Sequence, residues 1–223
     1  MQQLSMTVHC GNDAPNFSRV SDLERYNMAD LLKMDPQRIA RLRDEARLEQ
    51  VNPEWVLDVV TPTGTGPIVD VGAGVGFVSL PFARRFADTQ IIACDVLPGM
   101  LELLADTAGE EKLNNLRTAL MADPVSLTLD DDEAGLLIML QVHHELDDAL
   151  GLLRECRRVL APGAPVIVVD WKDENLPGMP PGGRRVAESQ IVRDLTDSGF
   201  GEVSCHDVYS FHSAVTGISP PER

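Results

Sequence analysis

A glycine-rich segment, DVGAGVGF at residues 70–77, carries the strongest chemical signal in this sequence. It follows an apolar run typical of a buried strand and precedes a stretch typical of a helix, the context in which such a turn binds a ligand. Glycine lets the backbone turn sharply and lets a ligand approach without a Cβ in the way. We therefore expect a ligand at the carboxyl end of the first strand of an α/β sheet.

The spacing of the glycines distinguishes between kinds of ligand. A dinucleotide fingerprint that begins at Gly72 requires glycine at position 77, where Phe77 stands, and the third glycine comes one place early at Gly76. Asp70 stands beside these glycines, and a carboxylate there would repel a pyrophosphate but suits a ligand with a cationic amino-acid end. The segment therefore favours a ligand with a cationic amino-acid end over a dinucleotide.

Two further aspartates stand at the ends of predicted strands. Asp95 ends the second apolar run, where a carboxylate can accept hydrogen bonds from both hydroxyls of a ribose. Asp123 ends the third run, where its oxygens could accept from an adenine amino group. Each residue alone also fits a loop or a helix cap. Together with Asp70 they put three acids at successive strand ends, which indicates one common site.

Candidate acceptor-side residues follow the fourth and fifth strands. His143 and His144 come just after the fourth strand, where a general base would sit, although His144 also fits a structural role in the turn. Asp170, Trp171 and Lys172 end the fifth strand. Trp171 fits either an acceptor contact or a cover for the core, and Lys172 fits either an acceptor contact or a solvated charge.

The elements that must position these residues alternate between short apolar runs and helical stretches, which predicts a parallel, doubly wound α/β sheet. The predicted strands are 67–71, 91–96, 116–123, 135–142 and 164–171, followed by a hairpin within 202–218. Helices are expected around 76–87, before Pro162-Gly163, and before Ser198-Gly199. Asp35-Pro36 and Asn52-Pro53 predict helix starts in the N-terminal third, because proline tolerates the first helical position.

Composition limits the function classes. The 223 residues are 43% hydrophobic and carry 35 acidic against 19 basic residues, a net charge of −16 that disfavours nucleic acid and anionic membrane surfaces as partners. The scattered cysteines and the N-terminal sequence, which has no export signal, predict a cytoplasmic protein. His9 and Cys10 are adjacent in a polar lead-in, 1–20, and do not form a metal site, so we expect no metal.

The chain resembles the class I S-adenosylmethionine-dependent methyltransferases. VDVGAGVGFVSLPFARR resembles the first motif of that family, CDVLPGMLELL the second and MAD the third. LLIMLQVHHELDD and RRVLAPGAPVIVVDWKDE resemble later segments of its small-molecule branch, near the ubiquinone and menaquinone biosynthesis methyltransferases. The resemblance covers about residues 22–216. It implies a Rossmann-like, seven-stranded, mostly parallel sheet with an antiparallel last strand and N-terminal helices.

The same resemblance implies roles for individual residues. S-adenosylmethionine would be the cofactor, with its methionine end held by Asp70, Gly72, Ala73, Gly74 and Gly76. Its ribose would be held by Asp95, and its adenine would be contacted by Val96, Ala122 and Asp123. Leu140 and Gln141 would face the sulfonium, and Tyr26 would help to cover the cofactor. The segment at residues 178–181 reads GMPP where similar proteins often read GPP, which leaves the substrate-side loop open.

The leading hypothesis is therefore an enzyme that methylates a small, uncharged or cationic acceptor, with His144 as catalytic residue and Trp171 and Lys172 at the substrate. A nicotinamide-dependent oxidoreductase and a non-catalytic cofactor-binding module remain as alternatives. We expect residues 1–60 to form a lead-in and helices that cover the cofactor and residues 61–223 to form the methyltransferase domain. The oligomeric state stays open, with a homodimer as one candidate.

Overall fold

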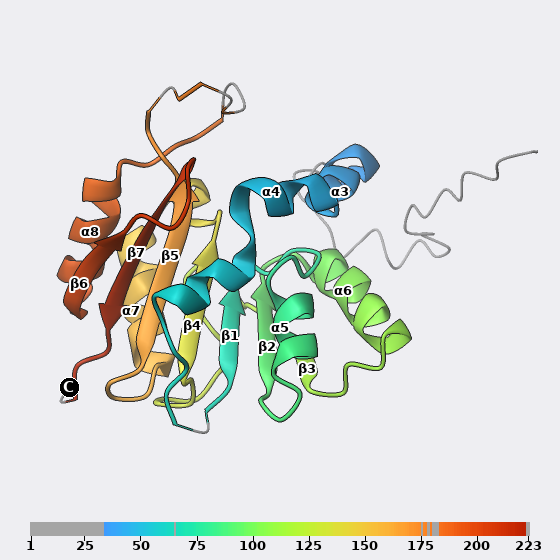
Figure 1. Cartoon of the computed structure of the whole chain (residues 1–223). Coiled ribbons are helices and arrows are strands. Elements are labelled where there is room, and N and C mark those ends of the chain that lie inside the picture. Colours follow the sequence, from blue (N-terminus) through green and yellow to red (C-terminus); the bar gives the residue numbers. More distant parts are fainter. Residues whose placement is uncertain (1–33, 65, 175, 178, 180–182, 222–223) are drawn as a thin grey trace, which may run out of the picture. The chain divides into compact units, whose positions relative to one another are not determined.

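A seven-stranded sheet organises the chain, with its strands in the order β3-β2-β1-β4-β5-β7-β6 (Figure 1). β1 to β5 run parallel, β7 is antiparallel to β5, and β6 pairs antiparallel with β7. The strands are β1 (Ile68–Val71), β2 (Ile91–Asp95), β3 (Leu116–Leu120), β4 (Leu136–Leu140), β5 (Pro165–Trp171), β6 (Gly201–His206) and β7 (His212–Ile218). The predicted Rossmann-like α/β sheet, with its antiparallel last strand and C-terminal hairpin, is confirmed.

The computed structural model describes residues 34–64, 66–174, 176–177, 179 and 183–221. The chain divides into two compact units, Met1–Arg41 and Leu42–Arg223, and the second unit holds the whole sheet. His9, Cys10, Tyr26 and the predicted lead-in lie outside the described residues. In the described ranges, no helix has the length and apolar character needed to cross a bilayer.

Helices cover both faces of the sheet. One face is covered by the 3₁₀ helix η2 (Pro53–Asp58), α5 (Ser79–Arg85) and α6 (Pro98–Glu110), with Val51 of α4 (Leu48–Val51) joining the same core. The other face is covered by α7 (Ala149–Val159) and α8 (Glu188–Asp197). The remaining helical segments are α3 (Pro36–Leu42) and the 3₁₀ helices η1 (Glu45–Arg47) and η3 (His143–Glu145). Successive residues of a strand point to opposite faces, so central strands such as β1 and β4 contribute to both cores.

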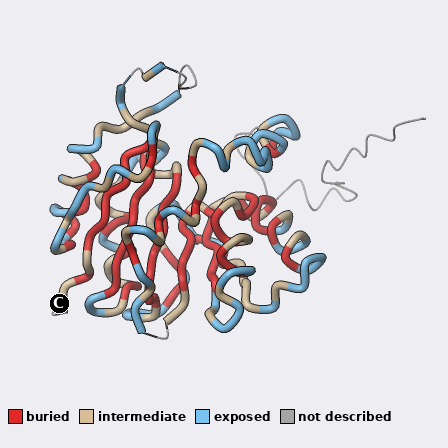
Figure 2. The backbone as a smooth tube through the Cα atoms, in the orientation of Figure 1, coloured by how far each residue is buried: buried red, intermediate tan, exposed pale blue. Residues whose placement is uncertain are grey.

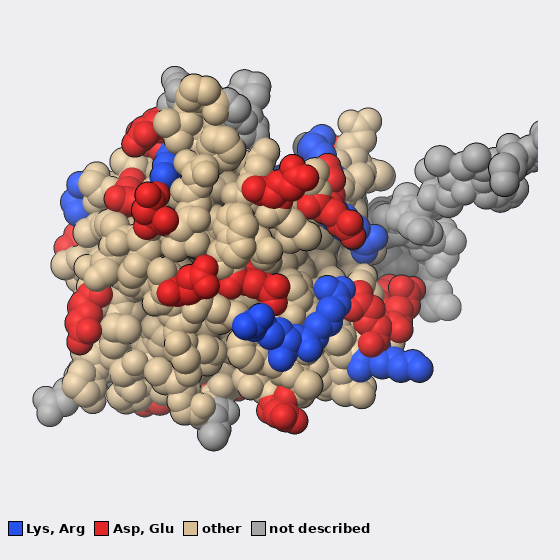
Figure 3. All heavy atoms as spheres, viewed as in Figure 1, with Lys and Arg blue, Asp and Glu red and all other residues tan. Residues whose placement is uncertain are grey.

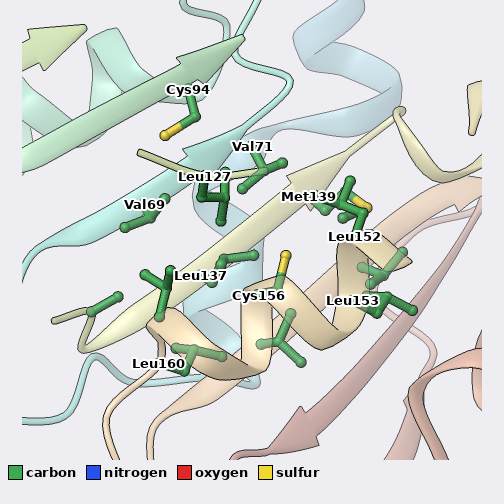
Figure 4. Packing of buried hydrophobic residues seen from close by; sticks show 14 of the residues in the cluster. Val69, Val71, Cys94, Leu127, Leu137, Met139, Leu152, Leu153, Cys156 and Leu160 are labelled. Carbon is green, nitrogen blue, oxygen red and sulfur yellow. The ribbon is translucent and has the colours of Figure 1, made fainter. Parts of the chain in front are cut away.

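The core under α7 shows how this packing is built (Figure 4). Val69 of β1 and Leu137 and Met139 of β4 belong to one buried cluster with Leu152 and Cys156 of α7. Each such aliphatic side chain contributes about 1.5–3 kcal/mol when it is fully buried. The sheet and α7 therefore hold the carboxyl ends of the central strands in fixed positions.

Burial falls from the centre of the sheet to its edges (Figure 2). Every residue of β1, β2 and β4 is buried, as expected for parallel strands covered on both faces. The two edge strands, β3 and β6, are mostly half-buried or exposed. The continuous apolar run at 135–142 was therefore a correct indication of a central strand.

Two sequence-based predictions of element type or length need correction. The segment that begins at Asn52-Pro53 is a 3₁₀ helix rather than an α-helix, although the side chain of Asn52 caps it by accepting from the Glu54 N–H at 3.0 Å. The third strand ends at Leu120 rather than at residue 123. Its partner β2 ends at Asp95, which pairs with Leu120, so no strand is present to continue the ladder.

Both predicted helix stops are confirmed. α7 ends at Val159, before the Pro162-Gly163 turn, and α8 ends at Asp197, with Gly199 following at a φ of +89°. These stops place the next strand of the sheet directly after each helix. The sheet order also reverses between β1 and β4, and in such sheets ligands bind outside the carboxyl ends of the strands at that point.

Candidate active site

The glycine turn leaves the carboxyl end of β1 in a conformation that glycine favours. Gly72, Gly74 and Gly76 have φ values of +74°, +52° and +92°. A Cβ at Gly72 would lie 2.4 Å from a methyl of Val142, and one at Gly76 would lie 2.3 Å from Leu104. At Gly74 no atom lies within 4 Å of the Cβ position. Packing thus excludes side chains at the two ends of the turn, while the middle of the turn faces open space.

Backbone hydrogen bonds fix this turn against β2. The N–H groups of Gly72 and Ala73 both donate to the carbonyl of Cys94, at 2.8 and 2.9 Å. The N–H of Gly76 donates to the Ala73 carbonyl at 2.9 Å. The turn is therefore shaped by the fold itself before any ligand binds.

Asp95 connects the turn to the end of β2. Its Oδ2 accepts from the Gly74 N–H at 2.8 Å and its Oδ1 accepts from the Leu97 N–H at 2.9 Å. Val96 follows, half-buried and packed against the core that contains β1. The two segments that were predicted to hold one ligand are thus joined through one carboxylate.

Asp70 lies under the turn rather than at its surface. Its side chain is 2% exposed, and its Oδ2 accepts from the Ser79 hydroxyl at 2.5 Å, at the start of α5. Burial raises the pKa of Asp70 to about 7, although the hydrogen bond from Ser79 opposes the rise and the charge of Asp95 adds to it. Asp70 therefore supports the start of α5 and titrates near neutral pH.

Ala122 and Asp123 lie beyond the end of β3. The Asp123 carboxylate accepts from the Val125 N–H and from the Ser126 hydroxyl, both at 2.9 Å, and so closes a turn. Asp123 is exposed, and the side chain that would reach an adenine is already engaged in this local cap. Its predicted adenine contact stays a prediction.

The end of β4 is held by side chains from distant segments. Gln141, directly after Leu140, has a left-handed φ of +58°. Its Oε1 accepts from Arg47 Nη2 at 2.7 Å, and its Nε2 lies 2.8 Å from Nε2 of His212 on β7. Burial lowers the pKa of His212 to about 4, so this ring is neutral and accepts from the amide. Three segments thus meet at the predicted sulfonium contact.

His144 forms a pair with Asp170 at the end of β5. Its Nδ1 lies 2.6 Å from Asp170 Oδ1, and its backbone N–H donates to Asp170 Oδ2 at 2.9 Å. Burial of the ring opposes protonation, but the hydrogen bond and charge of Asp170 outweigh it, so the pKa of His144 lies above its ordinary value. Asp170 itself is fully buried. The pair can hold and release a proton near the strand ends.

The neighbouring His143 is placed differently. It is buried, and its Nε2 lies 3.1 Å from Asp194 Oδ2 on α8. Burial lowers its pKa, against the opposing charge of Asp194. His143 therefore belongs to the packing between η3 and α8, whereas His144 belongs to the pair at the end of β5.

Trp171 and Lys172 stand at the edge of this group. The ring of Trp171 lies 4.0 Å from the ring of His212, centroid to centroid, and Arg185 lies 5.9 Å from the Trp171 centroid. Lys172 Nζ donates to the carbonyls of Tyr209 and Ser210, at 3.1 and 3.3 Å. Trp171 thus lies beside His212, the ring that contacts Gln141, while Lys172 points to the loop before β7.

The structure brings together most of the predicted residues and adds two, Arg47 and His212, that sequence reasoning did not assign to the site. Asp70, the glycines, Asp95, Gln141, His144 and Trp171 all lie at the carboxyl ends of β1, β2, β4 and β5. The pairing of the two predicted residues Asp170 and His144 was not foreseen. Position 170 at a strand end was a usable signal, but nothing in the local sequence marks Arg47 or His212.

Comparisons with known proteins point to one family. Residues 69–168 match the family model described as "Methyltransferase domain". The chain is 28% identical over 109 residues to the chloroplastic tocopherol O-methyltransferase of Arabidopsis thaliana, covering 49% of this chain and 31% of that protein. It is 26% identical over 183 residues to the O-methyltransferase aoiF of Aspergillus oryzae, covering 75% and 39%. The chain thus spans between three and four tenths of the length of these curated relatives.

Solved structures agree with this fold. A SAM-dependent methyltransferase from Aquifex aeolicus superimposes with a TM-score of 0.75 at 27% identity, covering 82% of this chain and 98% of that one. The phosphoethanolamine N-methyltransferase 2 of Haemonchus contortus, solved with S-adenosyl-L-methionine, gives a TM-score of 0.63 at 14% identity, covering 76% and 52%. The second comparison supports the fold alone.

Proposed function

Because this chain carries a class I S-adenosylmethionine-dependent methyltransferase domain, we propose that it transfers a methyl group from S-adenosylmethionine to a small-molecule acceptor. Two relatives, named tocopherol O-methyltransferase and O-methyltransferase aoiF, support a small-molecule acceptor. The net charge of −16 disfavours nucleic acid. On the face shown in Figure 3 basic side chains lie beside acidic ones. Arg84, for example, pairs with Glu111 at 2.6 Å.

The observation that carries the proposal is the contact between Gly74 and Asp95. This contact connects the glycine turn, which has open space at its middle residue, with the Asp95 carboxylate at the end of the neighbouring strand. A nucleoside with an amino-acid tail would need both features side by side. Asp95 would accept from the ribose hydroxyls, with Val96, Ala122 and Asp123 toward the adenine. Gly72, Ala73, Gly74, Gly76, Leu140 and Gln141 would hold the methionine end. When bound, S-adenosylmethionine supplies a methyl group activated by a positively charged sulfur.

His144 is the proposed general base. Asp170 accepts from Nδ1–H, which leaves the lone pair of the neutral ring on Nε2. His144 would take the proton of an acceptor hydroxyl or amine on that nitrogen, and Asp170 would stabilise the resulting cation. Trp171 would pack against the acceptor, with Lys172 at its edge. Holding the acceptor in line with the methyl group supplies the rest of the rate enhancement.

The first test is a calorimetric titration of the purified protein with S-adenosylmethionine and, in parallel, with NADH. Saturable binding of S-adenosylmethionine alone is the expected result. Binding of NADH alone would revive the oxidoreductase alternative and reject the methyltransferase proposal. Transfer of a labelled methyl group to phenolic and amine acceptors then separates an enzyme from a binding module, because a module binds the cofactor without turnover.

The proposal extends to the compartment, the assembly and the cover of the cofactor. Cys94 and Cys156 are buried free thiols, which suits a reducing compartment such as the cytoplasm. A homodimer is one candidate assembly. The residues up to position 60 remain the proposed cover of the cofactor, although residues 42–60 are part of the same compact unit as the sheet.

A further inference from the structure

Arg47 is a cation held inside the site by neutral groups. Its Nη1 donates to the Leu42 carbonyl and its Nη2 to Gln141 Oε1, both at 2.7 Å. Its guanidinium carbon lies 3.8 Å from the centroid of the Phe77 ring. In the part of the chain that the structure describes, no carboxylate forms an ion pair with it. Arg47 also lies outside the matched range 69–168, so the family match gives it no role.

Burying the Arg47 charge without a negatively charged partner in the described chain costs solvation free energy, which an anionic ligand would offset. Burial lowers the pKa of Arg47 to about 10, against the opposing charge of Asp44, so the side chain stays charged at neutral pH while it loses hydration. The two hydrogen bonds use two of its five N–H donors and supply no negative charge. A partly desolvated guanidinium in this state favours an anionic ligand, and its planar fork suits a carboxylate.

The contacts of Arg47 indicate where that anion lies. Phe77 directly follows the glycine turn, and Gln141 directly follows β4, so Arg47 spans the two segments that would hold the methionine end of the cofactor. Gln141 cannot turn its amide over freely, because His212 accepts from its Nε2 while Arg47 donates to its Oε1. The guanidinium is therefore held in place before a ligand arrives, which lowers the entropy lost on binding.

We infer that Arg47 binds the carboxylate of the amino-acid end of the cofactor. The inference rests on the proposed function, because it requires S-adenosylmethionine as the ligand. Asp70 lies buried below the same turn against Ser79, so it supports the turn and leaves Arg47 as the charged side chain proposed to meet the amino-acid end. An acidic group on the acceptor is the other source of such an anion, and the experiment below separates the two.

The test compares two ligands that differ by one group. S-adenosylmethionine and decarboxylated S-adenosylmethionine share the adenosine, the sulfonium and the amine, and only the first has the carboxylate. Each is titrated by calorimetry into wild type, Arg47→Gln, Arg47→Lys and Arg43→Gln. Arg43 is an exposed arginine four positions earlier, so its substitution removes the same charge from the same segment without touching the site. Thermal unfolding without ligand checks that each variant is folded.

Wild type should prefer S-adenosylmethionine over the decarboxylated ligand, and Arg47→Gln should lose that preference. We expect Arg47→Gln to weaken S-adenosylmethionine binding by roughly 10- to 100-fold, the range of one or two charge-assisted hydrogen bonds, and to leave the decarboxylated ligand unchanged. Arg47→Lys should fall between the two, and Arg43→Gln should match wild type.

Two results would overturn the inference while the proposed function survives. Equal weakening of both ligands in Arg47→Gln would mean that Arg47 only positions Phe77 and Gln141. Unchanged binding of both ligands would remove Arg47 from the cofactor site, and a loss of methyl transfer at unchanged cofactor affinity would assign it to an acidic acceptor. If wild type binds neither ligand, the proposed function fails, and the inference fails with it.

Discussion

The carboxyl ends of β1 and β2 and those of β4 and β5 hold their functional groups in different ways. At the first pair the backbone does the positioning: Gly72 and Ala73 donate to the Cys94 carbonyl, and Gly74 donates to Asp95. At the second pair, side chains from distant segments interlock, as in Arg47 with Gln141 and His144 with Asp170. The backbone contacts of the first pair would position the cofactor. At the second pair Arg47 and Gln141 would reach the amino-acid end of the same cofactor, while His144 and Asp170 would act on the acceptor.

The difference also predicts which substitutions affect the cofactor. Asp95→Ala should weaken S-adenosylmethionine binding about 100-fold, because it removes the carboxylate that would accept two ribose hydroxyls and that now accepts from Gly74 and Leu97. His144→Ala should leave that affinity within about 3-fold, since no contact in the described chain links His144 to the turn. Calorimetry of both variants measures this. Similar losses of S-adenosylmethionine affinity in Asp95→Ala and His144→Ala would show that His144 contributes to the cofactor site as much as Asp95 does.

Asp70 provides a test through pH. Its pKa is raised by burial to about 7, so the folded protein keeps a proton that the unfolded chain releases near pH 4. Stability from this group is greatest below pH 4 and declines as pH rises toward 7. Asp70→Asn should remove that decline, which is on the order of 4 kcal/mol. Urea unfolding of both proteins from pH 4 to 8 measures it, and parallel curves would show that Asp70 has an ordinary pKa.

Gly72 tests whether the turn is fixed by packing. Gly72→Ala should destabilise the fold by about 2 kcal/mol, because its Cβ would meet Val142 at 2.4 Å and its φ is +74°. Gly109→Ala is the matched control: it lies inside α6, where a Cβ meets nothing within 4 Å, and should stabilise slightly. Denaturant midpoints compare the two. Equal midpoints would mean that the turn adapts at little cost.

The smallest expected effect concerns the His144–Asp170 pair. Asp170 raises the pKa of His144, so Asp170→Asn should lower it, and an NMR titration of the imidazole follows the change. The raised pKa of His144 stabilises the folded protein at pH values below the pKa of histidine in the unfolded chain. This stabilisation is lost as the pH rises through the pKa of His144 in the folded protein. Asp170→Asn should therefore reduce the free energy of unfolding more at pH 5 than at pH 9. A His144 pKa that does not move would reject the pair as a functional unit.

The same comparison explains how far the sequence could predict the site. Asp70, the glycines and Asp95 could be found because each lies within a few residues of a strand end that hydrophobicity reveals. Arg47, Gln141 and His212 are separated by 94 and 71 residues along the chain, and only the finished fold brings them together. Local patterns contain no information on such contacts, so Arg47 and His212 were missed.

The fold was predicted more fully than the lengths of its elements. Buried runs such as 135–142 identify central strands because both of their faces are apolar. The third strand was predicted too long because its end is set by its neighbour, where Leu120 pairs with Asp95, and not by its own residues. The 3₁₀ form of Pro53–Asp58 was missed because a proline start and an Asn cap are common to both helix types.

Amide hydrogen exchange with and without S-adenosylhomocysteine tests the division of the site most directly. The account predicts that the ligand slows exchange mainly at residues 72–76 and 95–97, at the ends of β1 and β2, with a smaller effect at 143–145 and 171–172. Slowing confined to residues 143–145 and 171–172, with none at the glycine turn, would contradict it.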